Sequence, residues 1–264
     1  MPIVALVYDF DHTLSKGDMQ EFSFIPSLGM TTEEFWQKTA QTARENEMDS
    51  ILASMFQMLK EKKDRGEAIT RDYLRSLGDQ VAFYPGVIEW FARVNGYAEA
   101  LGLTVEHYIV SAGMAEMIEG TPIAGEFARI YACRYRYNEQ GEADWPAQSV
   151  NYTGKTQFLS RISKGVMDMM DEEMVNAHMP EEKRRIPFSR MMFIGDGFTD
   201  VPAMRYTRLN GGRAVAVYTQ EEKAATLLRG GRVDYTAPAD YRAASLLDSY
   251  VHRWLTDLAE GMKG

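Results

Sequence analysis

The sequence predicts an α/β fold: a Rossmann-like, doubly wound parallel sheet with a small helical cap inserted after the first strand. Short apolar runs rich in β-branched residues alternate with amphipathic stretches over most of the chain. This alternation is typical of a parallel sheet with helices on both faces. The stretch between the first two strand-like runs shows helical spacing only, which indicates an inserted helical unit.

The first predicted strand is an apolar run that begins at Ile3 and ends at Asp9. Hydroxyl caps followed by acids at 31–34 start a helix, apolar residues at helical spacing indicate another over 51–59, and 70–77 indicates a third. Residues 1–15 and 84–264 are therefore predicted to form the core domain. Residues 16–83 are predicted to form the cap, with its hinge at Lys16 and Gly17.

The remaining elements follow in order after a turn at 84–87 opens a helix through Val94. We expect strands at 103–110, 130–137 (in a hairpin), 191–195, 214–218 and 233–236, and helices at 115–119, 155–163, 201–206 and 221–229. Residues 167–185 are expected to be a solvated helix and loop. Asp240 is expected to cap a last helix whose core face comprises Ala243, Leu246, Leu247, Tyr250, Val251, Trp254 and Leu258.

Composition excludes several classes of protein. The 264 residues are 45% hydrophobic and carry a net charge of −9, which argues against a nucleic-acid partner bound through its phosphates. Cys133 is the single cysteine, so neither an intramolecular disulfide nor a cysteine metal cluster is possible, and we expect it to pack in a strand. No signal peptide or membrane-spanning run is visible, so we expect a cytoplasmic protein without a membrane partner.

Two acidic loops follow two of the predicted strands. Asp9 and Asp11 end the first strand, and Asp196 and Asp200 follow the strand at 191–195. Ligands of open α/β sheets bind at the carboxyl ends of the strands, where these loops would gather four carboxylates. Such a cluster needs a cation, and ligation by oxygen alone suits Mg²⁺.

A second pattern suggests an anion site at the same edge. Ser111 is expected to end a strand, with Ala112, Gly113 and a helix start after it, so that a hydroxyl and free amides point to one ligand. Lys155 opens a predicted helix and can direct its ammonium to the same place. Together these groups predict a pocket for the phosphate of a small phosphorylated substrate.

These residues resemble the four ordered motifs of the haloacid dehalogenase-like (HAD) hydrolase superfamily. The motifs are Asp9-Phe10-Asp11-His12-Thr13-Leu14, then Ser111, then Lys155, then Gly195-Asp196-Gly197-Phe198-Thr199-Asp200. Their spacing is most similar to the phosphoserine phosphatase-like branch. The resemblance implies a phosphoric monoester hydrolase that needs Mg²⁺.

The resemblance also implies a role for each motif residue. Asp9 would be the nucleophile that becomes an aspartyl phosphate, and Asp11 would protonate the leaving oxygen and then activate water. The remaining roles are phosphate binding by Thr13 and Ser111, charge neutralisation by Lys155, and metal binding by Asp9, the backbone carbonyl of Asp11, Asp196 and Asp200. An acid at Asp11 favours a phosphatase over a dehalogenase, because a halide needs no proton to leave.

Two alternatives stay open at this point. One is a phosphotransferase that uses the same intermediate, and the other is a non-catalytic, phosphate-sensing or partner-binding protein with this fold. His12 is expected to point away from the acids. The candidate selectors in the cap are Asp18, Glu21, Lys38 and Arg44, of which Asp18 is read first as a helix cap and Arg44 as solvated. Neither the substrate nor the oligomeric state follows from the sequence.

Overall fold

The computed structural model describes residues 1–262, and its centre is a seven-stranded sheet of order β4-β3-β2-β1-β5-β6-β7. β3 and β4 pair antiparallel, and all other neighbouring pairs are parallel. The central strand β1 is buried from Val4 to Tyr8. The strands are β1 (Ile3–Tyr8), β2 (Thr104–Met114), β3 (Phe127–Tyr137), β4 (Ala143–Gln148), β5 (Met191–Gly195), β6 (Arg213–Tyr218) and β7 (Tyr235–Pro238).

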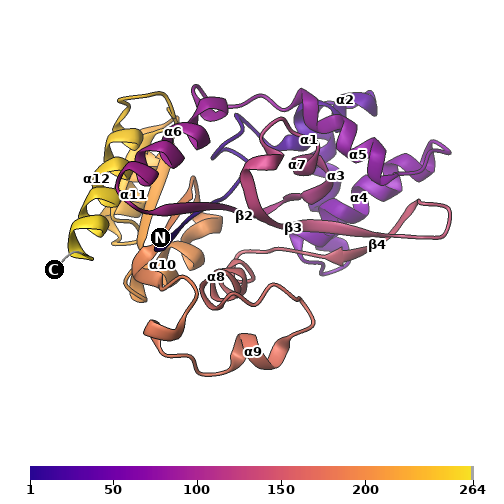
Figure 1. The fold of residues 1–264 in the computed structure, drawn as a ribbon. Coiled ribbons are helices and arrows are strands. Elements are labelled where there is room, and N and C mark those ends of the chain that lie inside the picture. Colours follow the sequence, from indigo (N-terminus) through magenta and orange to yellow (C-terminus); the bar gives the residue numbers. More distant parts are fainter. Residues whose placement is uncertain (263–264) are drawn as a thin grey trace.

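Helices cover both faces of this sheet. On one side α6 (Val87–Ala100) packs with α12 (Leu246–Gly261), and on the other α8 (Lys155–Lys164) packs with α10 (Val201–Leu209) (Figure 1). The other helices of this part are α7 (Ala115–Glu119), α9 (Glu172–Asn176) and α11 (Glu221–Arg229). Short 3₁₀ turns occupy Gly78–Gln80, Ala124–Glu126, Glu181–Lys183, Phe188–Arg190 and Phe198–Asp200.

Five helices lie between β1 and α6: α1 (Met19–Phe22), α2 (Phe24–Ser27), α3 (Thr32–Glu45), α4 (Ser50–Asp64) and α5 (Arg71–Leu77). They gather at one end of the sheet, beside the β3–β4 hairpin (Figure 1). The Tyr135 hydroxyl donates to the Met55 carbonyl at 2.6 Å, and the Ala143 amide donates to the Ile69 carbonyl at 2.7 Å. The helical insertion is therefore docked on the hairpin.

Many predicted elements are confirmed. The strand at 191–195 and the helices at 115–119 and 221–229 have the predicted bounds, and the 130–137 segment is one strand of a hairpin. Thr31 and Glu34 form a reciprocal capping box at the start of α3. Cys133 is buried in β3. Among the described residues, no helix is both long enough and apolar enough to span a membrane.

The predicted start of the last helix is wrong. Asp240 accepts hydrogen bonds from the amide and guanidinium of Arg242 instead of capping a helix. Ala244 has a φ of 62°, so a helix cannot run through it, and Ser245 caps α12 by accepting from the Asp248 amide at 3.1 Å. Ala243 lies outside the helix and Leu246 is 57% exposed. The buried face comprises Leu247, Val251, Trp254, Leu255 and Ala259, together with Asp248.

The segment 167–185 contains only the short helix α9 and one 3₁₀ turn, as its polar composition suggests. It is attached to the sheet at its end, where the Arg185 guanidinium donates two hydrogen bonds to the Glu106 carboxylate of β2, at 2.7 and 2.5 Å.

A buried polar chain anchors β1 just before Asp9. The Trp90 indole donates to the Tyr8 hydroxyl at 2.8 Å, and Tyr8 lies 3.0 Å from Nδ1 of His107. Nε2 of His107 lies 3.0 Å from Oδ1 of Asn95. This amide orientation assigns the ring proton to Nε2, so Nδ1 accepts the Tyr8 hydrogen. Burial lowers the pKa of His107 from 6.5 to about 3, and the ring is therefore neutral.

His107 makes the stability of the fold depend on pH. Between its folded and unfolded pKa values the unfolded chain binds a proton that the folded chain does not, so stability falls as the pH drops below about 6.5. We expect His107→Gln to weaken this dependence by up to about 1.4 kcal/mol per pH unit, measured by urea unfolding between about pH 7 and pH 5. The exposed His178 gives the control, His178→Gln, and an unchanged pH dependence in His107→Gln would contradict the assignment.

Candidate active site

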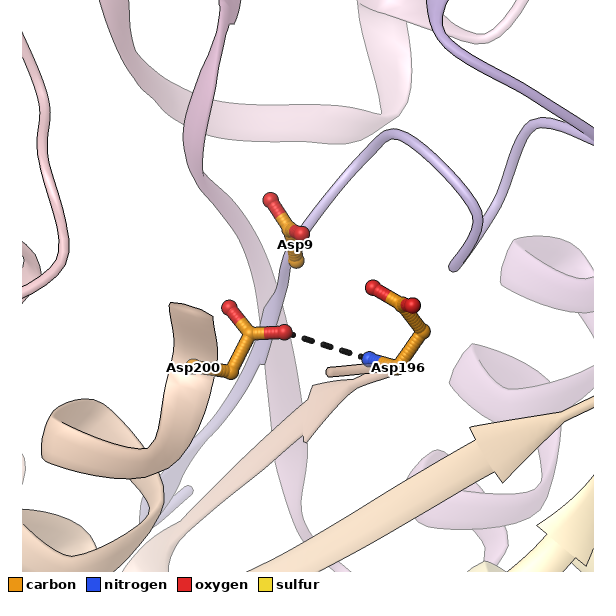
Figure 2. A group of neighbouring side chains, drawn as sticks. All are labelled: Asp9, Asp196 and Asp200. Carbon is orange, nitrogen blue, oxygen red and sulfur yellow. Dashed lines mark hydrogen bonds between the residues drawn. The ribbon is translucent and has the colours of Figure 1, made fainter. Parts of the chain in front are cut away.

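The two acidic loops begin side by side at the carboxyl edge of the sheet. β1 and β5 are neighbours with Tyr8 opposite Ile194, and the Asp9 amide donates to the Ile194 carbonyl at 2.9 Å. β5 runs only one residue further than β1, so the residues that follow the two strands, Asp9 and Asp196, leave the sheet close to each other (Figure 2).

Three carboxylates converge there. Asp9, Asp196 and Asp200 each offer an oxygen, and these oxygens all lie within 4.8 Å of one another (Figure 2). Burial, and after it the neighbouring carboxylates, raise the pKa of each of the three above its ordinary value. The side chain of Asp11 is not part of this group.

Lys155 joins two of these carboxylates. It is the first residue of α8, its side chain is 1% exposed, and its Nζ lies 2.9 Å from Oδ1 of Asp9 and 2.6 Å from Oδ1 of Asp200. Burial alone would lower the pKa of Lys155, but the charges of Asp200 and Asp9 outweigh it and raise the pKa. Lys155 therefore stays cationic and offsets part of the negative charge.

Asp200 fixes the second acidic loop. Its Oδ2 accepts from the amides of Asp196 and Gly197, both at 3.2 Å, while its Oδ1 faces Lys155. Only glycine fits at Gly195, because a Cβ there would lie 2.5 Å from Oδ2 of Asp200. With both oxygens engaged in this way, Asp200 positions Asp196.

Sequence reasoning missed Lys223. Its Nζ lies 2.8 Å from Oδ2 of Asp196, with the lysine side chain 42% exposed. Lys223 lies in α11, which follows β6, the neighbour of β5 in the sheet. Knowledge that β6 lies next to β5 would have placed the helix after β6 near Asp196. Without the strand order, the sequence around Lys223 is typical of an ordinary exposed helix lysine.

The donor set of this cluster fits a divalent metal ion. Three carboxylates offer oxygen ligands only, which hard cations such as Mg²⁺ prefer. Burial and the neighbouring carboxylates raise the pKa of each of the three, although Lys155 and Lys223 act in the opposite direction. A bound cation would relieve that repulsion.

Asp11 lies apart from this cluster and faces the helical insertion. Its Oδ1 accepts from the Met19 amide at 2.9 Å. Burial raises its pKa well above the ordinary value, and the charges of Asp18 and Asp9 raise it further. The backbone of Gly113 lies close against both side chains, because a Cβ there would lie 2.9 Å from Oδ2 of Asp11 and 2.2 Å from Cε of Met19 and would displace them.

The predicted anion site at Ser111 differs from expectation. β2 continues through Ala112 and Gly113 to Met114, with a register shift against β3 after Val110, so no helix starts beside Ser111. Ser111 is buried and its Oγ accepts from the Gly113 amide at 3.0 Å, which removes that amide from the expected donors.

Thr13 is also placed unexpectedly. It is fully buried, its Oγ1 has no hydrogen-bond partner, and its carbonyl accepts from the Tyr241 hydroxyl at 2.9 Å. Thr13 does not line the cavity that lies between Asp11 and the helical insertion.

A cavity of about 420 Å³ lies between Asp11, the end of β2 and the helical insertion. Asp11 and Ala112 line it from the core, and Glu21, Trp36 and Ser54 are among the residues that line it from the helices. This volume lies within the usual range for small-molecule sites.

Two of the four candidate selectors face this cavity. Asp18 and Glu21 line it, whereas Lys38 and Arg44 do not. Lys38 is paired with Glu61 at 2.8 Å. The Glu21 carboxylate accepts from the Trp36 indole at 3.0 Å.

Two expectations for this region are wrong. Asp18 precedes α1, but its side chain makes no capping hydrogen bond and lies 3.7 Å from Nε2 of His12. His12 has a φ of 56°, so the chain has left the strand, and its ring faces Asp18 instead of pointing away from the acids. Chiefly because of the neighbouring Asp18 carboxylate, the pKa of His12 is raised to about 9.

The chain belongs to the haloacid dehalogenase-like hydrolase family, whose model matches residues 6–205. It is 27% identical over 279 residues to an uncharacterized protein of Borreliella burgdorferi, covering 94% of this chain and 95% of that protein.

Solved structures share the fold at low sequence identity. A HAD family hydrolase from Salmonella enterica serovar Typhi has a TM-score of 0.61 at 16% identity and covers 91% of this chain and 69% of its own. A phosphoserine phosphatase determined as a phospho-aspartyl intermediate analogue has a TM-score of 0.57 at 15% identity and covers 89% and 93%. The predicted family, fold class and phosphoserine phosphatase-like architecture are confirmed.

Removing Lys155 tests whether the buried ion cluster holds this edge together. We expect Lys155→Met to lower the free energy of unfolding by about 3–5 kcal/mol, because it leaves buried carboxylates uncompensated. Adding Asp200→Asn should restore part of the loss. Urea unfolding at neutral pH measures both, with Lys60→Met, at an exposed pair, as the unaffected control. A loss no larger than that of Lys60→Met would contradict the structure.

Asp11→Asn should stabilise the fold. The amide oxygen can still accept from Met19, while the repulsion of Asp11 by Asp18 and Asp9 disappears. Because the pKa of Asp11 is higher in the folded than in the unfolded chain, the unfolded chain releases this proton more readily, so Asp11 lowers the stability of the fold at neutral pH but not in acid. We expect a gain of about 1 kcal/mol near pH 7 that shrinks towards pH 4, measured by thermal unfolding. Asp257→Asn, on an exposed part of α12, is the control, and a loss of stability in Asp11→Asn would refute this reading.

Proposed function

We propose that this protein is a Mg²⁺-dependent phosphatase that hydrolyses a small phosphorylated metabolite through an aspartyl-phosphate intermediate. One observation supports this most directly. Asp9 is held by Lys155 at the sheet edge, and Asp11, an acid with a raised pKa, lines the adjoining cavity. A nucleophile and a separate proton donor are the groups that the reaction requires.

In the first step, a carboxylate oxygen of Asp9 attacks phosphorus and the bond from phosphorus to the ester oxygen breaks. Asp11 gives its proton to the departing alcohol. In the second step Asp11 takes a proton from water, which attacks the same phosphorus and releases inorganic phosphate and free Asp9. Lys155 offsets the charge that Asp9 and the phosphoryl group share.

Asp9, Asp196 and the backbone carbonyl of Asp11 are the groups we propose to hold Mg²⁺, with Asp200 as a further ligand or as a support for Asp196. Bound there, the cation would screen the negative charge of the nucleophile from that of the phosphate. Asp200 keeps the loop of Asp196 in place through its two amide hydrogen bonds.

At the end of β2, we propose that the Ser111 hydroxyl and the backbone of Ala112 contact the phosphate. Ala112 lines the cavity, whereas the amide of Gly113 is already bonded to Ser111. The expected role of Thr13 as a phosphate ligand is less well supported, because its hydroxyl is fully buried.

Residues 16–83 are proposed to act as the cap domain over a core of residues 1–15 and 84–264. The two chain segments that would join these parts run side by side, with a bridge between Ser15 and Phe83 and a 2.8 Å hydrogen bond from the Lys16 amide to the Ala82 carbonyl. A paired crossing of this kind is suited to a hinge at which the cap closes and excludes water.

The proposal predicts hydrolysis of p-nitrophenyl phosphate that requires Mg²⁺ and stops when the metal is chelated. Asp9→Asn should lower kcat by at least about a thousandfold, because an amide is not a nucleophile for phosphorus. Release of nitrophenol and of inorganic phosphate is followed together, with Asp257→Asn as the control. Full activity in Asp9→Asn, or in the presence of excess chelator, would exclude this mechanism.

A further inference from the structure

The walls of the cavity next to Asp11 indicate what the substrate carries besides its phosphate. Resting on the proposed function, we propose that the alcohol part of the substrate bears a primary ammonium group and no carboxylate. The substrates would then be aminoalkyl phosphates.

The charged side chains in the cavity wall are negative. Asp11, Asp18 and Glu21 contribute carboxylates, and among the described residues no lysine or arginine lines the cavity. The two cationic candidates of the insertion, Lys38 and Arg44, are absent from the wall, and Lys38 is tied to the buried carboxylate of Glu61. Among the described residues, the charged side chains that a substrate carboxylate would meet in this wall are all acids, which makes its binding unfavourable.

Glu21 is the group best placed to bind a cation. Asp18 has a histidine partner in His12, and Asp11 accepts from the Met19 amide and serves the proposed chemistry. Within the part of the chain that the structure describes, the Glu21 carboxylate accepts only from the neutral Trp36 indole, which fixes its orientation without reducing its charge. An ammonium group would supply the missing positive charge and N–H donors for the carboxylate oxygens.

The rest of the wall suits a short alkyl chain. Ala40, Ala43, Ile51 and Met55 provide apolar contacts, and hydroxyls of α4 provide two polar points at Ser50 and Ser54. Of residues 1–262, Trp36 is the single aromatic residue in the wall, so these residues form no aromatic cage of the kind that quaternary ammonium ions prefer. A primary ammonium, which can donate hydrogen bonds to Glu21, is the better match.

The test compares esters that differ in one group. 2-Aminoethyl and 4-aminobutyl phosphate are measured against propyl and pentyl phosphate, in which a methyl replaces the ammonium, and against O-phosphoserine, which adds a carboxylate to the aminoethyl ester. We expect kcat/KM of the better aminoalkyl ester to exceed that of its alkyl counterpart and of phosphoserine by at least about tenfold, which corresponds to one well-formed charged hydrogen bond.

Glu21→Gln tests the assigned residue. It should reduce the ratio of aminoalkyl to alkyl kcat/KM to near one, whereas Glu33→Gln, at an exposed acid of α3 paired with Gln37, should leave the ratio unchanged. Hydrolysis of p-nitrophenyl phosphate without any preference for the aminoalkyl esters would overturn the substrate class and leave the proposed function standing. Absence of Mg²⁺-dependent hydrolysis of every ester would overturn both.

Discussion

The buried ammonium of Lys155 between Asp9 and Asp200 is the interaction on which the rest of the site depends. It lies at the start of α8 and reaches carboxylates that follow β1 and β5, so it joins three separate parts of the chain. Burying an isolated carboxylate costs free energy, and the Lys155 ammonium offsets this cost for two carboxylates at the edge of the sheet. Asp200 in turn fixes the second acidic loop, because its other oxygen accepts hydrogen bonds from the amides of Asp196 and Gly197.

The geometry divides the acids into two groups with different environments. Asp9, Asp196 and Asp200 form a cluster that suits a metal ion, while Asp11 turns towards the helical insertion and the cavity. Two carboxylates one residue apart can therefore do different chemistry, one as a nucleophile and the other as an acid. The same insertion that binds Asp11 through the Met19 amide also provides Glu21 and Trp36, so under the proposed mechanism the groups for proton transfer and for substrate choice would both contact α1.

The sheet, most helices and the convergence of the two acidic loops could be predicted from the sequence. The hydrophobic periodicity locates the strands, and the topology of a parallel sheet brings their carboxyl ends to one edge. The sequence did not predict which of several available partners a polar side chain contacts. Asp18 faces His12 instead of capping α1, and Asp240 binds Arg242 instead of capping α12. Ser111 lies within a longer, irregular β2, and Lys223 reaches Asp196 only because β6 happens to be next to β5. The first two outcomes are choices between neighbouring partners in the chain, and the last two depend on tertiary contacts that no local pattern records.

Trapping the covalent intermediate tests the central claim most directly. The enzyme is mixed with substrate and Mg²⁺, quenched during turnover and treated with borohydride, which reduces an acyl phosphate to an alcohol and would convert the phosphorylated aspartate to homoserine. Peptide mass spectrometry then locates the change. The account predicts homoserine at position 9 in the wild-type protein and its loss when substrate is omitted. Continued turnover with no modification at Asp9, or with the modification at Asp11 or Asp196, would contradict it.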